Sequence, residues 1–210
     1  MSITAHCIVK NEENFVWYAI KSVVDFVDKI IVFDTGSTDK TVELIKKLVK
    51  EYPDKIIFEE KGPCDGKRHT ELRQEMLEKT KTDWFMILDG DEVWTGQGMQ
   101  EAINIIGADD ADCIESFFYE CVGDIYHTHF KPGYKTIRFV KRGNIEWKGD
   151  YGVDTLVSQK TGEIITNQKS VVLKNKFWHL THLRRSAKDS EEYSSGTTRI
   201  NKRRPTYFLI

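Results

Sequence analysis

The fold of this chain is decided by one stretch, Trp84-Phe85-Met86-Ile87-Leu88-Asp89-Gly90-Asp91-Glu92-Val93-Trp94, in which apolar residues lead directly into carboxylates. The apolar run 84–88 predicts a short strand that is buried on both faces, as in the interior of an α/β sheet. Asp89 and Asp91 are two residues apart, so both side chains project to one side of an extended backbone. Carboxylates at a buried strand end are costly unless a cation neutralises them, which a hard divalent ion with oxygen ligands does. The alternative is a strand that ends in an ordinary polar turn.

Upstream of this stretch, strand and helix patterns alternate along the chain. Apolar runs predict strands over 3–9, 29–33 and 55–59, and apolar residues at helical spacing predict helices over 15–27 and 40–52. This order is typical of a largely parallel, doubly wound α/β sheet. Ligands of such sheets bind beyond the carboxyl ends of the strands.

Polar residues cluster where three of these strands are expected to end. The clusters are Lys10-Asn11-Glu12, the segment 34–39 and the segment 89–92. Their convergence predicts a binding site at this edge of the sheet. Arg73 lies on a helix predicted within 61–81, just before the central strand. It is either a solvated surface charge or a group that neutralises a phosphate or the carboxylates.

The second half of the chain is richer in strand and aromatic patterns than in helix. One helix is predicted over 99–106, and strands are predicted over 112–119, 136–140, 144–149 and 171–173. These strands should add an antiparallel portion on the substrate side. The remaining segments are 177–182, which is aromatic and contains two histidines, and 183–204, which is polar and basic.

The composition restricts the classes of function. With 31 basic and 33 acidic residues among 210, the formal net charge of −2 argues against broad electrostatic binding of nucleic acid. The four cysteines form no CxxC pair and have no metal-type spacing. No signal-peptide pattern and no apolar run of about 18 residues is found, so no membrane span is expected and a cytoplasmic location is the default.

Four motifs, in this order and spacing, resemble the family-2 glycosyltransferases of the GT-A fold. They lie within roughly the first 95 residues: Cys7-Ile8-Val9-Lys10-Asn11-Glu12-Glu13, Val32-Phe33-Asp34-Thr35-Gly36-Ser37-Thr38-Asp39-Lys40-Thr41, Arg73-Gln74, and the segment 83–92. Ile137-Arg138-Phe139 and Ile145-Glu146-Trp147-Lys148-Gly149 resemble the acceptor-side region of that family, and the segment 179–186 resembles its closing histidine motif. The resemblance implies one GT-A domain over 1–183, divided into a nucleotide-sugar half, 1–95, and an acceptor half, 96–183. A basic tail follows over 184–210.

The resemblance also implies a function: metal-dependent transfer of a sugar from a nucleotide-diphosphate donor, expected to be a UDP-sugar, with inversion at the anomeric carbon. It assigns Asp91 as the catalytic ligand of Mn²⁺ or Mg²⁺, with His179 or His182 completing the metal or diphosphate site. The residues that it assigns to the donor are Val9, Lys10, Asn11, Glu12, Asp34, Asp39, Arg73, Asp89 and Gly90. A divalent ion and an arginine suit this chemistry, because the leaving diphosphate develops negative charge.

The general base departs from the family pattern. Relatives often carry a valine-histidine-glutamate triplet after the tryptophan-x-glycine segment, whereas this chain reads Gly149-Asp150-Tyr151-Gly152-Val153-Asp154-Thr155. The acceptor hydroxyl or amine needs a base within hydrogen-bond reach. Asp154 is the first candidate, followed by Asp150 or Glu146, and the alternative for each is an inert loop carboxylate.

The histidines also leave alternatives open. His179 and His182 share a face if their segment is helical, and each is either structural or functional. His127 and His129 alternate as metal ligands do on a strand, but no acid cluster lies near them in the sequence, so an ordinary polar role is preferred. The same holds for the remaining histidines, His6 and His69.

Two other functions fit in part. A sugar nucleotidyltransferase shares the doubly wound sheet and a carboxylate-held metal, but its Gly-rich, basic signature after the first strand is missing from 10–13. A catalytically degenerate nucleotide-sugar-binding protein is favoured only by the missing histidine-glutamate pair. The acceptor is left open among a protein side chain, a glycan, a lipid-linked sugar and a modified nucleobase, and the oligomeric state is not indicated.

Overall fold

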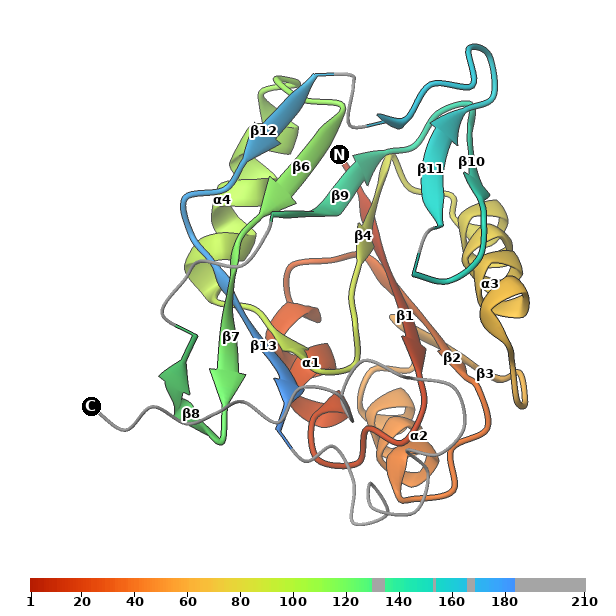
Figure 1. Ribbon diagram of the computed structural model, residues 1–210, viewed down its shortest axis with the longest axis vertical. Coiled ribbons are helices and arrows are strands. Elements are labelled where there is room, and N and C mark those ends of the chain that lie inside the picture. Colours follow the sequence, from red (N-terminus) through yellow and green to blue (C-terminus); the bar gives the residue numbers. More distant parts are fainter. Residues whose placement is uncertain (130–134, 153, 166–168, 184–210) are drawn as a thin grey trace.

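The fold is built on a seven-stranded sheet with helices on both faces (Figure 1). The computed structural model describes residues 1–129, 135–152, 154–165 and 169–183. The helices are α1 (Val16–Val23), α2 (Thr41–Glu51), α3 (Gly66–Lys79) and α4 (Gly96–Gly107). The strands are β1 (Ile3–Val9), β2 (Lys29–Asp34), β3 (Ile56–Glu60), β4 (Trp84–Ile87), β5 (Glu92–Val93), β6 (Cys113–Ser116), β7 (Phe118–Val122), β8 (Asp124–Thr128), β9 (Thr136–Lys141), β10 (Ile145–Lys148), β11 (Thr155–Ser158), β12 (Ser170–Val172) and β13 (Phe177–His182).

The large sheet is mostly parallel. Its strand order is β12-β6-β9-β4-β1-β2-β3, in which β1 pairs in parallel with both β2 and β4, and β2 pairs in parallel with β3. Strand β9 runs antiparallel to its neighbours β4 and β6. This arrangement confirms the predicted α/β class, including the antiparallel portion contributed by the second half of the chain.

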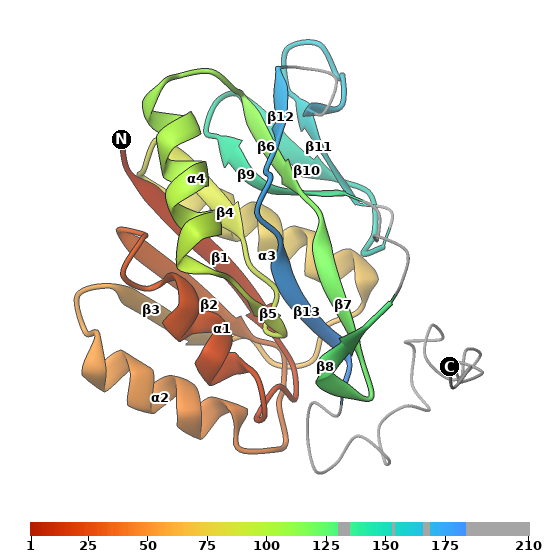
Figure 2. The ribbon, with the colours of Figure 1, turned by 90° about the vertical axis from the view of Figure 1, so that its left-hand side faces the viewer.

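Helices cover the two faces of this sheet unequally. Figure 2 shows α1, α2 and α4 on one face and α3 on the other. Ile20 of α1, Ile45 of α2 and Met99 of α4 are fully buried in one apolar cluster, whereas Leu72 and Met76 of α3 are buried in another. Burial of such side chains is the main favourable contribution to folding. In the described part of the chain, every helix is too short or too polar to cross a membrane.

Two smaller sheets complete the fold. Strands β10 and β11 form an antiparallel pair, and a four-stranded sheet has the order β5-β13-β7-β8. Strand β5 belongs to the central stretch of sequence and pairs with β13, which pairs in turn with β7. The four-stranded sheet therefore brings the end of the described chain against the carboxylates of residues 89–92.

The structure corrects several predicted boundaries. The first helix ends at Val23 rather than residue 27, and the strand predicted over 112–119 is interrupted at Phe117 to give β6 and β7. Strands β5, β8, β11 and β13 are not among the predicted elements. All five side chains of β8 are exposed, so the strand carries no alternation of buried and exposed positions that a sequence pattern could reveal.

The segment that contains His179 and His182 is a strand, β13, so the shared face that a helix would have given them does not arise. Residues three apart point to opposite faces of a regular strand. Between these two histidines, however, the register of β13 against β7 shifts, which changes how their side chains are presented. The predicted basic tail, 184–210, lies outside the described residues.

Candidate functional site

The carboxyl ends of β1, β2 and β4 meet at one edge of the large sheet, the lower edge in Figure 1. Val9 at the end of β1 is in register with Asp34 at the end of β2, and His6 of β1 is in register with Ile87 at the end of β4. The three polar clusters predicted from the sequence follow these strand ends. The structure therefore places them side by side, as the doubly wound topology requires.

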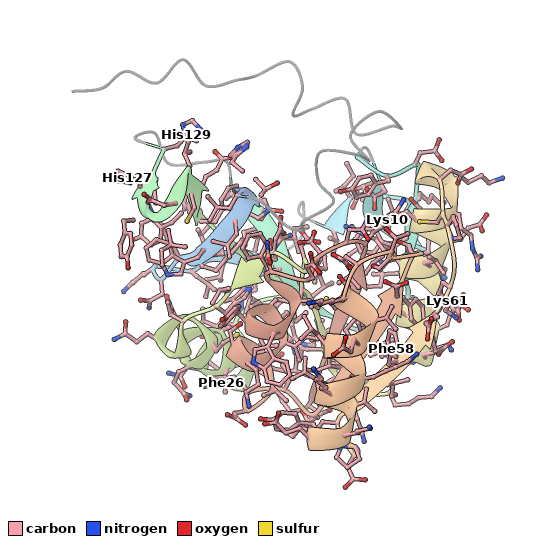
Figure 3. All side chains as sticks on the ribbon, turned by 90° about the horizontal axis from the view of Figure 1, so that it is seen from below. Lys10, Phe26, Phe58, Lys61, His127 and His129 are labelled. Atoms are coloured by element: carbon pink, nitrogen blue, oxygen red, sulfur yellow. The ribbon has the colours of Figure 1, made fainter. Side chains whose placement is uncertain are left out.

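Hydrogen bonds join the loops that follow β1 and β2. The backbone N–H of Asn11 donates to Ser37 Oγ at 2.8 Å, and the backbone N–H of Thr38 donates to Asn11 Oδ1 at 2.8 Å. Asn11 has a φ of 55°, a left-handed conformation that asparagine tolerates better than most residues. The backbone N–H of Glu12 donates to Thr41 Oγ1 at 2.7 Å. These contacts fix one loop against the other, and Lys10 lies exposed beside them (Figure 3).

The two aspartates of the second loop have different surroundings. Asp34 is buried, and its Oδ2 accepts hydrogen bonds from the backbone N–H groups of Gly36 and Ser37, each at 3.0 Å. Its Oδ1 is buried and has no hydrogen-bond partner among the described residues, so it is available to a ligand. Asp39 instead accepts from the backbone N–H groups of Glu13 and Thr41, which gives it a role in holding the loops together.

Gly90 is required by close packing between the first loop and the central stretch. A Cβ atom at this position would lie 2.8 Å from Val9 Cγ1 and 3.0 Å from Glu12 Cγ. Any larger residue would push these segments apart. The glycine therefore sets the two aspartates beside the loop after β1: the Asp91 side chain is buried, whereas that of Asp89 is 41% exposed.

A buried arginine neutralises part of this acidic group. Arg138 of β9 forms an ion pair with the fully buried Glu92, and its Nη2 lies 3.2 Å from Asp89 Oδ2. The sequence patterns included Arg138 in the acceptor-side segment but gave it no role of its own. The available signal was a charged residue at the centre of an otherwise apolar strand, because a buried charge needs a partner.

Burial and neighbouring charges shift the pKa values of this group. Burial raises the pKa of Glu92 to about 7, although the Arg138 charge opposes the shift. Burial disfavours the charged form of Arg138, but the charges of Glu92 and Asp89 outweigh it and raise the pKa of the guanidinium. Burial likewise opposes the charged form of His179, but its hydrogen bond to Asp91 and the nearby carboxylates raise its pKa.

The side chains at this edge fit a divalent cation. His179 Nε2 lies 3.5 Å from Asp91 Oδ1, and one ligand atom each from Asp89, Glu92 and His179 lie within 4.8 Å of one another. Glu92 Oε2 and His179 Nδ1 are buried and have no hydrogen-bond partner among the described residues. Carboxylate oxygens with one imidazole nitrogen suit Mn²⁺ and, with fewer nitrogen ligands, Mg²⁺.

The structure places His182 in different surroundings. Its Nε2 lies 2.9 Å from Glu120 Oε1, and its ring contacts that of His129. Of the two histidines that the resemblance offered for the metal, His179 is the one that contacts Asp91.

A pocket opens beside Asp89 on the α3 side of the sheet, and its lining includes His6, His69, Arg73 and Trp147. Arg73 of α3 lies over the Trp147 ring, with its guanidinium carbon 4.6 Å from the ring centroid. The same arginine forms an ion pair with Asp154, Nη1 to Oδ2 at 3.1 Å, so Asp154 contacts a residue that lines the pocket.

The pocket wall contains a histidine whose pKa gives the fold a pH dependence. His6 Nε2 is 2.6 Å from Thr80 Oγ1, and its ring stacks on Phe85. Burial, and then the charge of Arg73, lower the pKa of His6 to about 3. Below pH 6.5 the unfolded chain binds a proton at this position that the folded chain does not, so stability falls as the pH falls.

At pH 5 this difference corresponds to about 2 kcal/mol for His6. Glu92, whose pKa is raised to about 7, and His69, whose pKa is lowered to about 4, also contribute to the pH dependence, so the test compares wild type with His6→Gln. Between pH 7.5 and pH 5, urea unfolding of wild type should lose about 2 kcal/mol more stability than that of His6→Gln. His127→Gln, at an exposed histidine, should retain the wild-type pH dependence. An unchanged pH dependence in His6→Gln would contradict the assignment.

Residues 5–181 match the family model described as Glycosyl transferase family 2. The chain therefore belongs to glycosyl transferase family 2, as the four motifs indicated.

Known proteins with similar sequence or structure agree with this membership. The SPbeta prophage-derived glycosyltransferase SunS of Bacillus subtilis (strain 168) is 30% identical over 125 residues, which cover 60% of this chain and 27% of that protein. SunS of Bacillus phage SPbeta matches equally. The chain thus spans about a quarter of the length of these curated relatives.

The solved structures show the same fold. The crystal structure of S. aureus TarS has a TM-score of 0.61 at 13% identity, over 85% of this chain and 36% of that one. TarS 1–349 in complex with UDP-GlcNAc has a TM-score of 0.58 at 15% identity, over 85% of this chain and 58% of that one. This likeness confirms the GT-A architecture.

Proposed function

We propose that this chain is a metal-dependent, inverting glycosyltransferase domain that takes its sugar from a UDP-sugar. The observation that carries the proposal is the group formed by Asp89, Asp91, Glu92 and His179 at the carboxyl edge of the sheet. An acidic group of this kind can bind a divalent ion, and Arg73 in the adjacent pocket would add positive charge for the phosphates that the ion neutralises.

Asp34 supports a nucleotide donor at the same edge. Its unpartnered Oδ1 is positioned to accept an N–H of a nucleobase, while the linked loops after β1 and β2 form the wall of the binding site. A buried acceptor discriminates strongly against a ligand that leaves it unpaired. Uracil offers one such N–H. TarS, whose fold this chain shares, has been crystallised with UDP-GlcNAc, which also favours a UDP-sugar.

Asp91 and His179 would hold the Mn²⁺ or Mg²⁺ ion, and Glu92 would have its free Oε2 directed toward it. The ion supplies positive charge to the departing diphosphate. Arg138 positions Glu92 and Asp89, and its charge prevents the three carboxylates from repelling one another. Arg73, beside Asp89 in the pocket, adds a second positive charge for the phosphates.

Asp154 is the proposed general base. Its side chain is only 6% exposed, and its ion pair joins it to Arg73, which lines the pocket together with Trp147. A carboxylate held in this way can accept a proton from an acceptor hydroxyl or amine.

Asp154→Asn should lower the rate of sugar transfer, or of donor hydrolysis by water, by about 10²–10⁴-fold, the usual contribution of a general base. The affinity for UDP should not fall, because Asn keeps the size of the side chain and its neutral amide leaves the Arg73 charge free for the phosphates. Steady-state rates and UDP titrations measure the two effects separately. Asp150→Asn, at an exposed position of the same loop, is the matched control. A wild-type rate for Asp154→Asn would remove Asp154 from the mechanism.

A thermal-shift screen tests the donor assignment. A ligand that binds only the native state raises its melting temperature, so nucleotide sugars and their parent nucleotides are compared with and without Mn²⁺. We expect UDP and a UDP-sugar to give the largest shifts, and only in the presence of the metal. Equal shifts for nucleotides of every base would contradict the role of Asp34.

A further inference from the structure

A second group of metal-ligating side chains lies on the four-stranded sheet, outside the stretch 89–92. Glu120 is on β7, His182 ends β13, and His129 follows β8 directly. One carboxylate oxygen and two imidazole nitrogens of these residues lie within 4.8 Å of one another. We propose that Glu120, His129 and His182 form a second metal site, which binds Zn²⁺ or a related transition-metal ion.

The carboxylate of Glu120 is at the centre of this group. Its Oε1 lies 2.9 Å from His182 Nε2, and its Oε2 lies 3.9 Å from His129 Nε2. The two imidazole rings approach edge to face, with their centroids 5.9 Å apart. Each oxygen therefore faces a different histidine, and small rotations of the side chains bring all three ligands onto one ion.

Backbone pairing holds the three ligands in place. The backbone N–H of His129 donates to the backbone oxygen of Glu120 at 3.0 Å, which fixes the end of the β7–β8 hairpin. Strand β13 pairs with β7 and shifts register between His179 and His182. His179 contacts Phe118 and His182 contacts Glu120, two residues further along the same face of β7. The register shift thus returns His182 to the face that carries Glu120.

The ligand chemistry selects a different metal from that of the Asp91 group. Two imidazoles and one carboxylate are a recurrent zinc ligand set that leaves a fourth position open. Imidazole nitrogen favours Zn²⁺ over Mg²⁺ and Mn²⁺. The three side chains are 27–47% exposed, so the ion can enter from solvent. Figure 3 shows His129 at the outer rim of the molecule, well apart from Lys10 in the loop after β1.

His127 provides a matched control on the same hairpin. Its Nδ1 lies 2.8 Å from Asp124 Oδ1, and its side chain is 77% exposed. Asp124 also accepts from the backbone N–H groups of Tyr126 and His127, so this pair is a local turn contact rather than part of the group around Glu120. The sequence showed the alternation of His127 and His129. It did not show that His127 lies beside Asp124, whereas His129 lies beside Glu120.

The test is titration of the full chain with Zn²⁺ alone by calorimetry, repeated with Co²⁺ followed by visible absorption. Wild type should bind Zn²⁺ with micromolar or better affinity, and Co²⁺ should develop the strong ligand-field bands of a four-coordinate site. His129→Ala should lose one equivalent of Zn²⁺ and these bands. His127→Ala should retain both. Excess Mg²⁺ should displace neither ion.

Three results would overturn the proposal: wild type without four-coordinate Co²⁺ bands, His129→Ala with wild-type Zn²⁺ binding, or half an equivalent of Zn²⁺ per chain together with dimer formation. Glu120→Gln gives a second variant, in which one ligand is weakened and the backbone pairing is unchanged. Because no donor is present, these results do not depend on transferase activity.

Discussion

Replacement of Asp91 by alanine should reduce metal-dependent release of UDP from the donor by at least about 10²–10³-fold, because the proposed mechanism makes Asp91 a ligand of the ion that stabilises the leaving diphosphate. The fold should persist. The side chain is buried, but it lies beside two other carboxylates and contributes little apolar surface. Initial rates over a range of Mn²⁺ concentrations, together with the melting temperature of each variant, measure both effects.

Asp110→Ala is the control, because Asp110 is an exposed carboxylate on the loop after α4. It should retain the wild-type rate and metal dependence. Full metal-dependent activity in Asp91→Ala would remove Asp91 from the metal site. A large loss of melting temperature in Asp91→Ala would assign the residue to the fold instead.

Arg138→Met should destabilise the protein by about 3–5 kcal/mol, the usual cost of removing one partner from a buried ion pair. Glu92 is fully buried and its pKa is about 7 even beside Arg138, so without the guanidinium it must either carry an uncompensated charge or bind a proton. For a chain of this size the loss corresponds to a fall in melting temperature of roughly 6–20 °C. Urea unfolding at pH 7.5 measures it directly.

Arg142→Met controls for the loss of a surface arginine near the end of the same strand and should be close to neutral. Arg138→Met combined with Glu92→Gln should recover part of the stability, because Gln has no charge to compensate and no proton to bind. Equal stability of Arg138→Met and Arg142→Met would show that the ion pair is not structural. Failure of the double variant to recover would show that Glu92 is not the partner that matters.

Much of the fold of residues 1–95 could be predicted from the sequence, because its signals are local. The apolar run 84–88 and the alternating segments before it specify buried strands and amphipathic helices through the residues themselves. Once the parallel order is inferred, the positions of Asp34 and Asp89 at one edge follow from topology. For these elements the structure confirms the fold and changes only the boundaries.

The partners of the carboxylates could not be predicted in this way. Arg138 reaches Asp89 across 49 positions of sequence, and only because β9 inserts antiparallel beside β4. Strand order in the second half is set by long-range pairing, which leaves no periodic signal. The roles of His179 and His182 depend on one register shift in β13, which the sequence alone does not reveal.

The central claim is that the acidic edge of the sheet is a metal-dependent sugar-transfer site. The most direct measurement is the release of UDP from a panel of UDP-sugars by the purified chain, in Mn²⁺ and in EDTA. We expect slow release from one donor in Mn²⁺ and none in EDTA or in Asp91→Ala. Donor binding without release in either condition, release that is independent of metal, or pyrophosphate-dependent exchange in place of release would contradict it.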